Sequence, residues 1–479
     1  MSFGFFRIWA SALALGLLGA CGSLPVAVEK PVSHHQTATP AQSPLAQLAA
    51  TQLPDGAPSG FRLLPLGPYA LDARLALIER ATRTLDLQVY IMNNDESGRA
   101  VFAALRDAAR RGVRVRLLLD DLNSAGAEAL IEVLATLPNF EIRLFNPFCC
   151  LRSSFAGRIA SSLGDLSRLD HRMHNKLLIA DGALAILGGR NIGDEYFGRD
   201  PYANFIDLDA IAAGLVVPQL AGIFDRYWNS GDAFPMAALT GKGPQDPPST
   251  AALEQLLPAS AVNIDLQLPE KDLLGRGPVS AELKANRLTL LPAVAYAVAD
   301  RPDKRQLPLD DLEFDTLMAG ARSNMLGTRS QLVIVSPYLV PGKPGMALLR
   351  SLQVKGVEQT AVTNSLASND SAVVYYGYAR YRLPMVQAGV KLYEISAMPN
   401  GNSRTLFGGS SRGRLHAKLM VIDQQTVLLG SLNLDPRSSR KNTEVGTAID
   451  SPAIAAEALR IVDAMKTEAY QVLLESPKA

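Results

Sequence analysis

The stretch HNKLLIAD at residues 174–181 has a counterpart in HAKLMVID at residues 416–423. Both carry a histidine, a lysine and an aspartate with the same gaps between them, and both continue into a glycine and an asparagine. Each matching pair, from the two histidines to the two asparagines, is 242 positions apart. A lone H-x-K arises often by chance, whereas a doubled unit at one offset indicates a duplicated domain.

Helical and strand-like segments alternate before each motif. In the first half, residues 70–82 and 98–113 have apolar residues at helical spacing, and residues 85–92 and 115–121 are β-rich. The second half repeats this order. We therefore expect an α/β fold of two duplicated domains, each with a mixed, largely parallel sheet flanked by helices.

Length and charge limit the function classes. The chain has 479 residues, enough for two domains, and a formal net charge of +1. Proteins that bind nucleic acid through phosphate contacts are usually strongly basic, so we expect no nucleic-acid partner. The three cysteines, Cys21, Cys149 and Cys150, form neither a disulfide framework nor a set with metal-ligand spacing.

Residues 1–21 have the features of a secretory signal. Arg7 precedes an apolar run at residues 8–18, which is too short to span a bilayer. The segment LGAC at residues 18–21 resembles a bacterial lipobox, in which the cysteine, here Cys21, becomes the lipidated first residue. The alternatives are an ordinary signal peptide or a membrane-anchoring helix. We expect a lipid-anchored protein of the cell envelope that faces the periplasm, with the choice between inner and outer membrane left open.

The rest of the chain divides by composition. Residues 22–60 contain many prolines and no apolar periodicity, which predicts a flexible tether in which the histidines at 34–35 are solvated. We expect a first domain at residues 61–230, a connector at 231–284 and a second domain at 285–479.

The residue types in the motif suit a phosphate group. On a strand, His174 and Lys176 point to the same side, and Asn191 falls at the exit turn of the next strand. The equivalents in the second unit are His416, Lys418 and Asn433. Lysine supplies charge, asparagine supplies N–H donors, and histidine attacks phosphorus or transfers protons. Two imidazoles together supply a nucleophile and an acid, so we expect one active site at the interface of the halves, with no metal and no cofactor.

Other residues of the motif region are expected to have supporting roles. We expect Asp181 and Asp423 to brace the turns that follow their strands. We expect only a structural or rim role for His171. Apolar and aromatic residues at 373–381 either form part of a membrane-facing surface or pack in the core.

Both units resemble the HKD motifs of the phospholipase D superfamily, over nearly the whole chain after residue 60. HNKLLIADGALAILGGRNIGDEYFG at 174–198 and GSLNLDPRSSRKNTEVG at 430–446 resemble bacterial cardiolipin synthases. TNSLASND at 363–370 resembles the branch usually called cardiolipin synthase C. The resemblance implies two phospholipase D-like α/β domains.

The resemblance also implies roles for single residues. In this superfamily one histidine forms a covalent phosphohistidine and the other acts as acid and then as base. We assign His174 as the nucleophile and His416 as the acid and base. A carboxylate behind each histidine fixes its tautomer. Glu444 matches that position for His416, and Asp207 is the best match for His174.

The implied activity is that of a phosphatidyltransferase, which moves a phosphatidyl group onto phosphatidylglycerol to give cardiolipin. The expected partners are a membrane surface and phospholipids, with phosphatidylethanolamine as one candidate donor. Gly189 and Ser431, the small residues after the motif glycines, are expected to bind substrate. The alternatives are a phospholipase D that uses water, a nuclease, and a lipid-binding protein with a dead site. A dead site would require a lost histidine or lysine, and none is lost.

Overall fold

The computed structural model describes residues 24–25, 28–53, 56–152, 154–162, 165–242, 250–308, 316–398 and 412–474. The signal-like residues 1–21, with Cys21, lie outside them. Among the helices in these ranges, none is both long enough and apolar enough to cross a bilayer.

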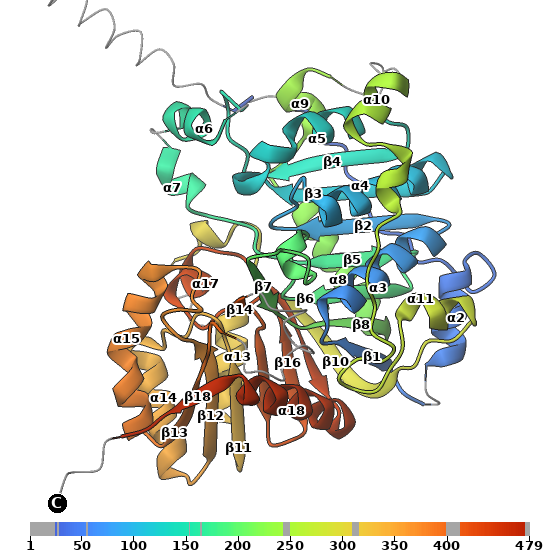
Figure 1. Cartoon of the computed structure of the whole chain (residues 1–479). Helices are drawn as coiled ribbons and strands as arrows, with labels where there is room; N and C mark the ends of the chain where they lie inside the picture. Colours follow the sequence, from blue (N-terminus) through green and yellow to red (C-terminus); the bar gives the residue numbers. More distant parts are fainter. Residues whose placement is uncertain are drawn as a thin grey trace, which may run out of the picture.

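One sixteen-stranded sheet runs through both halves (Figure 1). The first half contributes, in spatial order, β1 (Ser59–Leu64), β8 (Asp209–Gly214), β6 (Leu184–Gly188), β5 (Leu177–Ala180), β2 (Thr84–Val89), β3 (Arg114–Asp120), β4 (Phe140–Phe145) and β9 (Ala233–Pro235). The second half contributes β10 (Leu291–Ala299), β17 (Val445–Asp450), β16 (Thr426–Gly430), β15 (Leu419–Ile422), β11 (Gln331–Val335), β12 (Glu358–Asn364), β13 (Val390–Ile395) and β18 (Ala469–Val472). The two sets mirror each other across the antiparallel pair β1–β10, as expected of a duplicated domain.

The expectation of a largely parallel sheet is wrong. Between the described strands of this sheet, four pairings are parallel and eleven are antiparallel. The reason is local: each motif strand turns back at once instead of crossing over a helix. In the first half Asp181 (φ 54°) and Gly182 (φ 61°) have left-handed backbone, which closes the tight turn between β5 and β6.

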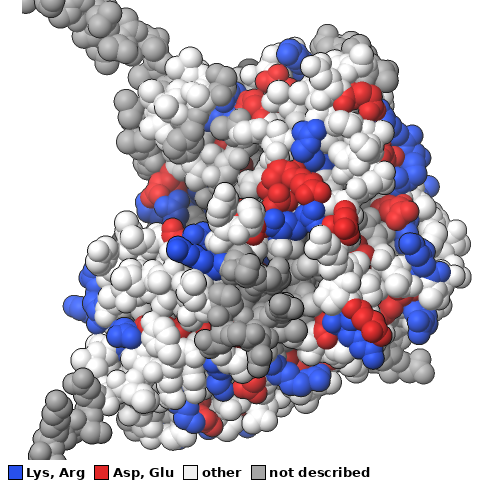
Figure 2. All heavy atoms as spheres, viewed as in Figure 1, with Lys and Arg blue, Asp and Glu red and all other residues white. Residues whose placement is uncertain are grey.

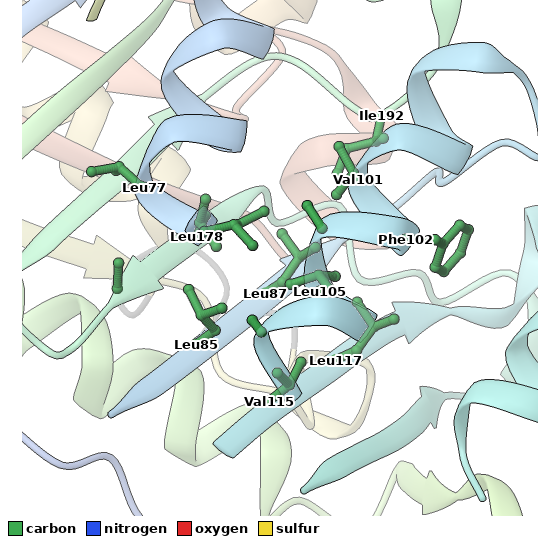
Figure 3. Close-up of a cluster of buried hydrophobic side chains, with 14 of the residues drawn as sticks. Leu77, Leu85, Leu87, Val101, Phe102, Leu105, Val115, Leu117, Leu178 and Ile192 are labelled. Atoms are coloured by element: carbon green, nitrogen blue, oxygen red, sulfur yellow. The ribbon is translucent and has the colours of Figure 1, made fainter. Parts of the chain in front are cut away.

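Helices cover one face of each half of the sheet. On the first half these are α3 (Gly67–Arg80), α4 (Glu96–Arg110) and α5 (Glu128–Leu134). Figure 3 shows Leu77 of α3 and Phe102 and Leu105 of α4 packed with Leu85 and Leu117 from the strands. Each such side chain contributes about 1.5–3 kcal/mol when fully buried. The matching helices on the second half are α13 (Leu317–Leu326), α14 (Gly342–Val354) and α15 (Ala372–Gln387).

A second core joins the halves on the opposite face. It contains residues of α8 (Val216–Trp228) and α18 (Pro452–Thr467) together with strand residues from both halves, such as Phe61 of β1 and Val445 of β17. Both of these side chains are fully buried. We call the junction between the two halves the seam. Because one core spans this seam, the halves form a continuous body.

The segment before β1 differs from the expected flexible tether, because much of it is bound to the first half. The Ala38 N–H donates to the carbonyl of Asp181 at 2.9 Å. The ring of His35 contacts Asp225 at 2.8 Å, so this histidine is not simply solvated. Helix α2 (Pro44–Gln52) begins with Ser43 as N-cap and Pro44 in its first turn, and it buries Leu45 and Leu48. This segment is therefore attached to the first half by single hydrogen bonds and one short helix, which is why its sequence shows no apolar periodicity.

The connector also packs on the first half. It includes β9, which pairs with β4, α9 (Met236–Thr240), α10 (Thr250–Leu256) and α11 (Val279–Lys284). Ser280 of α11 donates its N–H to Asp72 of α3 at 2.9 Å. Residues 243–249 lie outside the described residues.

Helix α15 leaves much of its surface in solvent. Val373 is 83% exposed and Tyr376 is 71% exposed, while Tyr378 is buried with its hydroxyl on Glu394. Only one side of the helix therefore packs in the core, and its other side presents apolar groups to solvent.

Candidate active site

Each histidine is held by the other half. The backbone N–H of His174 donates to the carbonyl of Thr443 at 2.9 Å, and the backbone N–H of His416 donates to the carbonyl of Ile206 at 2.8 Å. The strand β14 (Arg412–Leu415) before His416 pairs in parallel with β7 (Ala203–Ile206) of the first half. The motifs thus meet at the seam of the sheet.

The carboxylates behind the histidines are crossed. Nδ1 of His174 lies 2.8 Å from Oε2 of Glu444, and Nδ1 of His416 lies 2.6 Å from Oδ2 of Asp207. The expected assignment, in which Glu444 serves His416 and Asp207 serves His174, is wrong. The reason is that each carboxylate directly follows the residue whose carbonyl binds the histidine of the other half.

Both imidazoles are neutral near pH 7. Burial lowers the pKa of His174 to about 4, and Lys176 and Lys418 act in the same direction, against Glu444, which raises it. Burial and Lys418 likewise lower the pKa of His416. Because a carboxylate accepts the Nδ1 proton, each neutral ring carries its lone pair on Nε2. Such a ring can attack phosphorus or accept a proton.

The partner carboxylates remain ionised. Burial alone would raise the pKa of Asp207, but His416 and Lys418 lower it well below its usual range. The same balance, with His174 as the main opposing group, lowers the pKa of Glu444. Each carboxylate can therefore stabilise positive charge that develops on its imidazole.

Two buried lysines supply the positive charge. Lys176 Nζ donates to the carbonyl of His174 at 2.6 Å, and Lys418 Nζ donates to the carbonyl of His416. Burial lowers the pKa of Lys418 to about 8 and lowers that of Lys176 well below its usual value. A phosphodiester anion at this point would offset the burial and favour the ammonium form of both.

The two asparagines differ in their contacts. Asn191 donates from Nδ2 to the Tyr196 hydroxyl at 2.9 Å and accepts from the Ile91 N–H at 3.2 Å. Asn433 is buried, and its Oδ1 has no hydrogen-bond partner among the described residues. The amide of Asn433 is thus the one with unused bonding capacity at the site.

The motif aspartates hold turns. Asp181 accepts the N–H groups of Thr82, Arg83 and Thr84 at 2.8–3.2 Å and the hydroxyl of Ser43. Asp423 accepts the corresponding groups of Arg329, Ser330 and Gln331 at 2.8–3.1 Å. Each therefore ties the motif turn to the start of the neighbouring strand, β2 or β11.

Gly189 and Ser431, expected to bind substrate, lie against the crossed carboxylates instead. Ser431 Oγ donates to Glu444 Oε2 at 2.5 Å. A Cβ atom on Gly189 would collide with the carboxylate of Asp207. The two histidine–carboxylate pairs form two dyads. The residue after the motif glycine is serine at the Glu444 dyad and glycine at the Asp207 dyad, because the Asp207 carboxylate occupies the space that a side chain would need.

Comparison with known proteins agrees with this geometry. A family model described as "Cardiolipin synthase, PLD-like domain" matches residues 75–228 and 322–466, which is more than half of the chain and one match in each half. The chain belongs to this phospholipase D-like cardiolipin synthase family. It is accordingly a phospholipid-modifying enzyme.

Individual members and structures extend the comparison. Cardiolipin synthase C of Escherichia coli is 40% identical over 395 residues, covering 81% of this chain and 80% of that protein. A cardiolipin synthase of Geobacillus kaustophilus is 27% identical, with 88% and 68% covered. The crystal structure of phosphatidylserine synthase from Haemophilus influenzae has a TM-score of 0.59 at 12% identity, covering 89% and 92% of the two chains, which shows a shared fold.

The site has aromatic walls that the sequence did not reveal. The Tyr90 ring meets His174 edge-on at a centroid distance of 5.1 Å. Tyr196 and Phe205 contact His416 at 5.3 and 4.9 Å. These rings pack against the imidazoles, and both histidines are buried.

Asp120 and Asn364 are a second pair missed from the sequence. Asp120, at the end of β3, accepts the Met173 N–H at 2.9 Å. Asn364, at the end of β12, accepts the Leu415 N–H at 2.8 Å and donates to its carbonyl at 2.9 Å. Both brace the residue before a motif histidine. They are 244 positions apart instead of 242, so a search at the motif offset passes over them.

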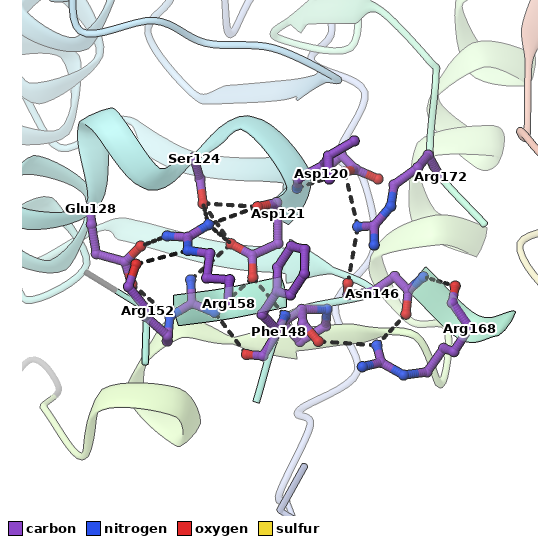
Figure 4. A network of polar contacts seen from close by, with 12 residues as sticks. Asp120, Asp121, Ser124, Glu128, Asn146, Phe148, Arg152, Arg158, Arg168 and Arg172 are labelled. Carbon is purple, nitrogen blue, oxygen red and sulfur yellow. Dashed lines mark hydrogen bonds and ion pairs between the residues drawn. The ribbon is translucent and has the colours of Figure 1, made fainter. Parts of the chain in front are cut away.

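A polar network extends this brace on the first half (Figure 4). Arg172 bonds Asp120 at 3.3 Å and the Asn146 carbonyl at 3.2 Å. Next to it, Asp121 accepts from Arg152 at 2.7 and 2.8 Å. His171, adjacent to Arg172, links the halves through the carbonyls of Lys441 and Pro302, each at 2.8 Å.

Charges on the visible surface are mixed. On the face in Figure 2, Lys and Arg side chains alternate with Asp and Glu, without a broad basic stripe. The large positive charges of the site are the two buried lysines. The face is thus unlike the basic surfaces that follow a nucleic-acid backbone.

Proposed function

We propose that this enzyme is a phosphatidyltransferase that makes cardiolipin. It transfers a phosphatidyl group from one phospholipid to a hydroxyl of phosphatidylglycerol through a phosphohistidine. The observation that carries the proposal is the pair of crossed histidine–carboxylate dyads around two buried lysines. The name of the relative at 40% identity supports the choice of product.

In the first step, Nε2 of His174 attacks the phosphorus of the donor lipid. A P–N bond forms, and the P–O bond to the leaving headgroup alcohol breaks. His416, charged when the substrate anion is bound, donates its proton to the leaving oxygen. Glu444 stabilises the positive charge on the His174 ring through Nδ1.

In the second step, Nε2 of His416 accepts the proton of the phosphatidylglycerol hydroxyl. The oxygen attacks phosphorus, and the P–N bond breaks. His174 returns to its neutral form, and Asp207 holds the reprotonated His416. Protons and charges therefore balance over the cycle without a further reactant.

Charge stabilisation comes from Lys176, Lys418 and the asparagines. The ammonium groups lie beside the non-bridging oxygens, whose charge grows in the transition state. Asn433 supplies N–H donors from its amide, with the oxygen turned away from phosphate. The aromatic walls limit water, which is the competing acceptor.

We further propose that the enzyme works on a membrane surface in the cell envelope, facing the periplasm and anchored by lipid on Cys21. The LGAC segment supports the anchor, although it lies outside the described residues. The exposed Val373, Tyr376 and Leu383 of α15 support contact with lipid. Cys21→Ser should release the protein from membranes, and finding residues 1–20 on the mature protein would contradict the anchor.

The test is purified enzyme in vesicles of phosphatidylglycerol and phosphatidylethanolamine. Cardiolipin should accumulate well above phosphatidic acid, and His174→Asn and His416→Asn should form neither. Dominant phosphatidic acid would indicate a phospholipase D. DNA cleavage without lipid turnover would indicate a nuclease. A cardiolipin-deficient host that expresses the chain gives the cellular counterpart.

A further inference from the structure

The packing between the first helix and the sheet differs between the two halves. In the first half, Arg74 of α3 reaches Asp209 of β8, with Nη2 3.0 Å from Oδ2, and both side chains are buried. Leu77 of α3 and Ile186 of β6 lie in the same core and are almost fully buried. The space between α3 and the strands is therefore filled.

In the second half the matching position is Gly446. It pairs with Gly430 in the sheet as Asp209 pairs with Gly188. No side chain rises from either glycine of the β16–β17 pair, and α13 stands over them. An empty volume of about 580 Å³, part of it open to solvent, remains between α13 and the sheet.

The walls of this cavity are largely apolar. Helix α13 contributes Leu317, Gly320, Ala321 and Asn324. The strands contribute mainly leucine, valine, methionine, alanine and glycine, and no aspartate or glutamate lines the cavity. An apolar cavity of this kind favours a hydrocarbon over water.

The cavity wall includes residues of the second motif. Lys418 is one of its wall residues, and so are Leu432 and Leu434 on either side of Asn433. The wall also includes Tyr296, which is 49% exposed, and Gly320, which is exposed as well. The cavity is therefore lined both by the motif lysine and by residues that reach the surface.

We propose that this cavity binds one acyl chain of the phospholipid whose phosphate lies between the two histidines. The assignment rests on the proposed function, because it takes the phosphate at Lys418 to be that of a lipid. A phospholipid carries its hydrocarbon a few bonds from its phosphate, which is the arrangement of the apolar walls and Lys418. The filled first half makes the site one-sided, so the two lipids of the reaction are held differently.

Photocrosslinking tests occupancy independently of turnover. The probe is phosphatidylglycerol with a diazirine near the end of one acyl chain, added to the His174→Asn variant so that no lipid is consumed. Crosslinks should map to Leu317, Ala321 or Met420. Labelling confined to α15 or other surface residues would overturn the proposal.

Gly320 offers a way to close the cavity from the helix. A Cβ atom there meets no atom within 4 Å, so the first atom of a larger side chain has room. In Gly320→Trp, KM for dioleoyl phosphatidylglycerol should rise at least about 10-fold, since each excluded methylene costs about fourfold in binding. Turnover of bis(4-nitrophenyl) phosphate, which has no acyl chain, should stay within about twofold.

Two controls accompany this variant. Gly320→Ala adds only a methyl group, and Ser323→Trp places the same indole on an exposed position of α13 that does not line the cavity. Both should keep the wild-type KM. Cardiolipin synthesis with unchanged KM in Gly320→Trp would overturn the acyl site alone. Absence of lipid turnover in the wild type, with phosphodiester cleavage retained, would instead overturn the proposed function.

Discussion

Nδ1 of His174 lies 2.8 Å from Oε2 of Glu444, although 270 positions separate the two residues. The reciprocal contact joins His416 to Asp207 across the same seam. Each motif imidazole therefore takes its tautomer and orientation from the opposite half.

The crossed dyads predict that two carboxylate variants have similar effects on natural lipids and different effects on an activated ester. Glu444→Gln and Asp207→Asn should each lower kcat on natural lipids by about 10³–10⁴-fold, because the imidazole loses its stabilising charge. With a phosphatidyl nitrophenyl ester, the leaving group needs no proton. Asp207→Asn should then release nitrophenol in a burst close to the wild-type rate, whereas Glu444→Gln should remain slow.

A stopped-flow burst measurement distinguishes the two pairings. The opposite order of recovery would indicate that Asp207 serves the nucleophile. Glu358→Gln, a change in an exposed ion pair with Lys391, serves as the control and should behave as the wild type.

The histidine variants should separate the two chemical steps. His174→Asn should abolish turnover on every substrate, because no nucleophile remains. His416→Asn should also stop turnover of natural lipids, yet with the nitrophenyl ester it should accumulate phosphatidyl-enzyme on His174. Mass spectrometry of protein quenched in denaturant at alkaline pH detects this adduct, because the P–N bond of a phosphohistidine is labile in acid. An adduct on any residue other than His174 would contradict the assigned roles, and His34→Asn, at an exposed histidine, is the matched control.

Buried neutral histidines make the fold sensitive to acid. His174 has a folded-state pKa of about 4, below its value of about 6.5 in the unfolded chain. The unfolded state therefore binds more protons between these values, so the free energy of unfolding falls as pH drops from about 6.5 to 4. His174 alone accounts for about 3 kcal/mol, and the lowered pKa of His416 acts in the same direction. Urea unfolding at several pH values between 7.5 and 4.5 measures the free energy of unfolding. This free energy should fall less steeply with decreasing pH in His174→Asn than in the wild type, and an equal dependence on pH would refute the linkage.

The motif aspartates should affect stability more than chemistry. Asp181→Ala leaves three backbone N–H groups without an acceptor, with an expected loss of about 2–4 kcal/mol. Asp423 is less buried, so Asp423→Ala should cost less. Urea titration measures both, with the surface change Asp463→Ala as a reference. Folded Asp181→Ala should retain a kcat within about tenfold of the wild type, and a loss comparable with His174→Asn would point to a chemical role.

The Gly189 and Ser431 positions should not be interchangeable. Gly189→Ser should impair folding or activity strongly, because the new side chain collides with Asp207. Ser431→Gly removes one donor to Glu444 but creates no clash, so its effect should be milder. The measurements are kcat and the melting temperature of each variant relative to the wild type. If Gly189→Ser left both unchanged, Asp207 would have to move freely, and the explanation for Gly189 would be wrong.

The sequence predicts the duplication well because His174 and His416 begin units with a constant offset. It does not predict the crossed carboxylates. Asp207 follows Asn191 by 16 positions, whereas Glu444 follows Asn433 by 11, so the offset is lost where the chain crosses the seam. Strand direction was missed because a buried apolar strand looks the same whether a hairpin or a helix follows it.

Other failures have local causes. Residues 28–53 are attached through scattered single contacts, such as Ser43 on Asp181, and these leave no periodic pattern. The cavity under α13 depends on Gly446 facing Gly430, and that contact is visible only once the strand register is known.

The exchange of carboxylates between halves has a consequence for biosynthesis. A ribosome completes the first half well before Glu444 is made, so a nascent chain folded to β9 holds His174 without its partner. The same intermediate lacks His416 and Lys418 altogether. Chemistry at the two-histidine site therefore begins only after the strands of the second half have docked, and a chain truncated before them is inert.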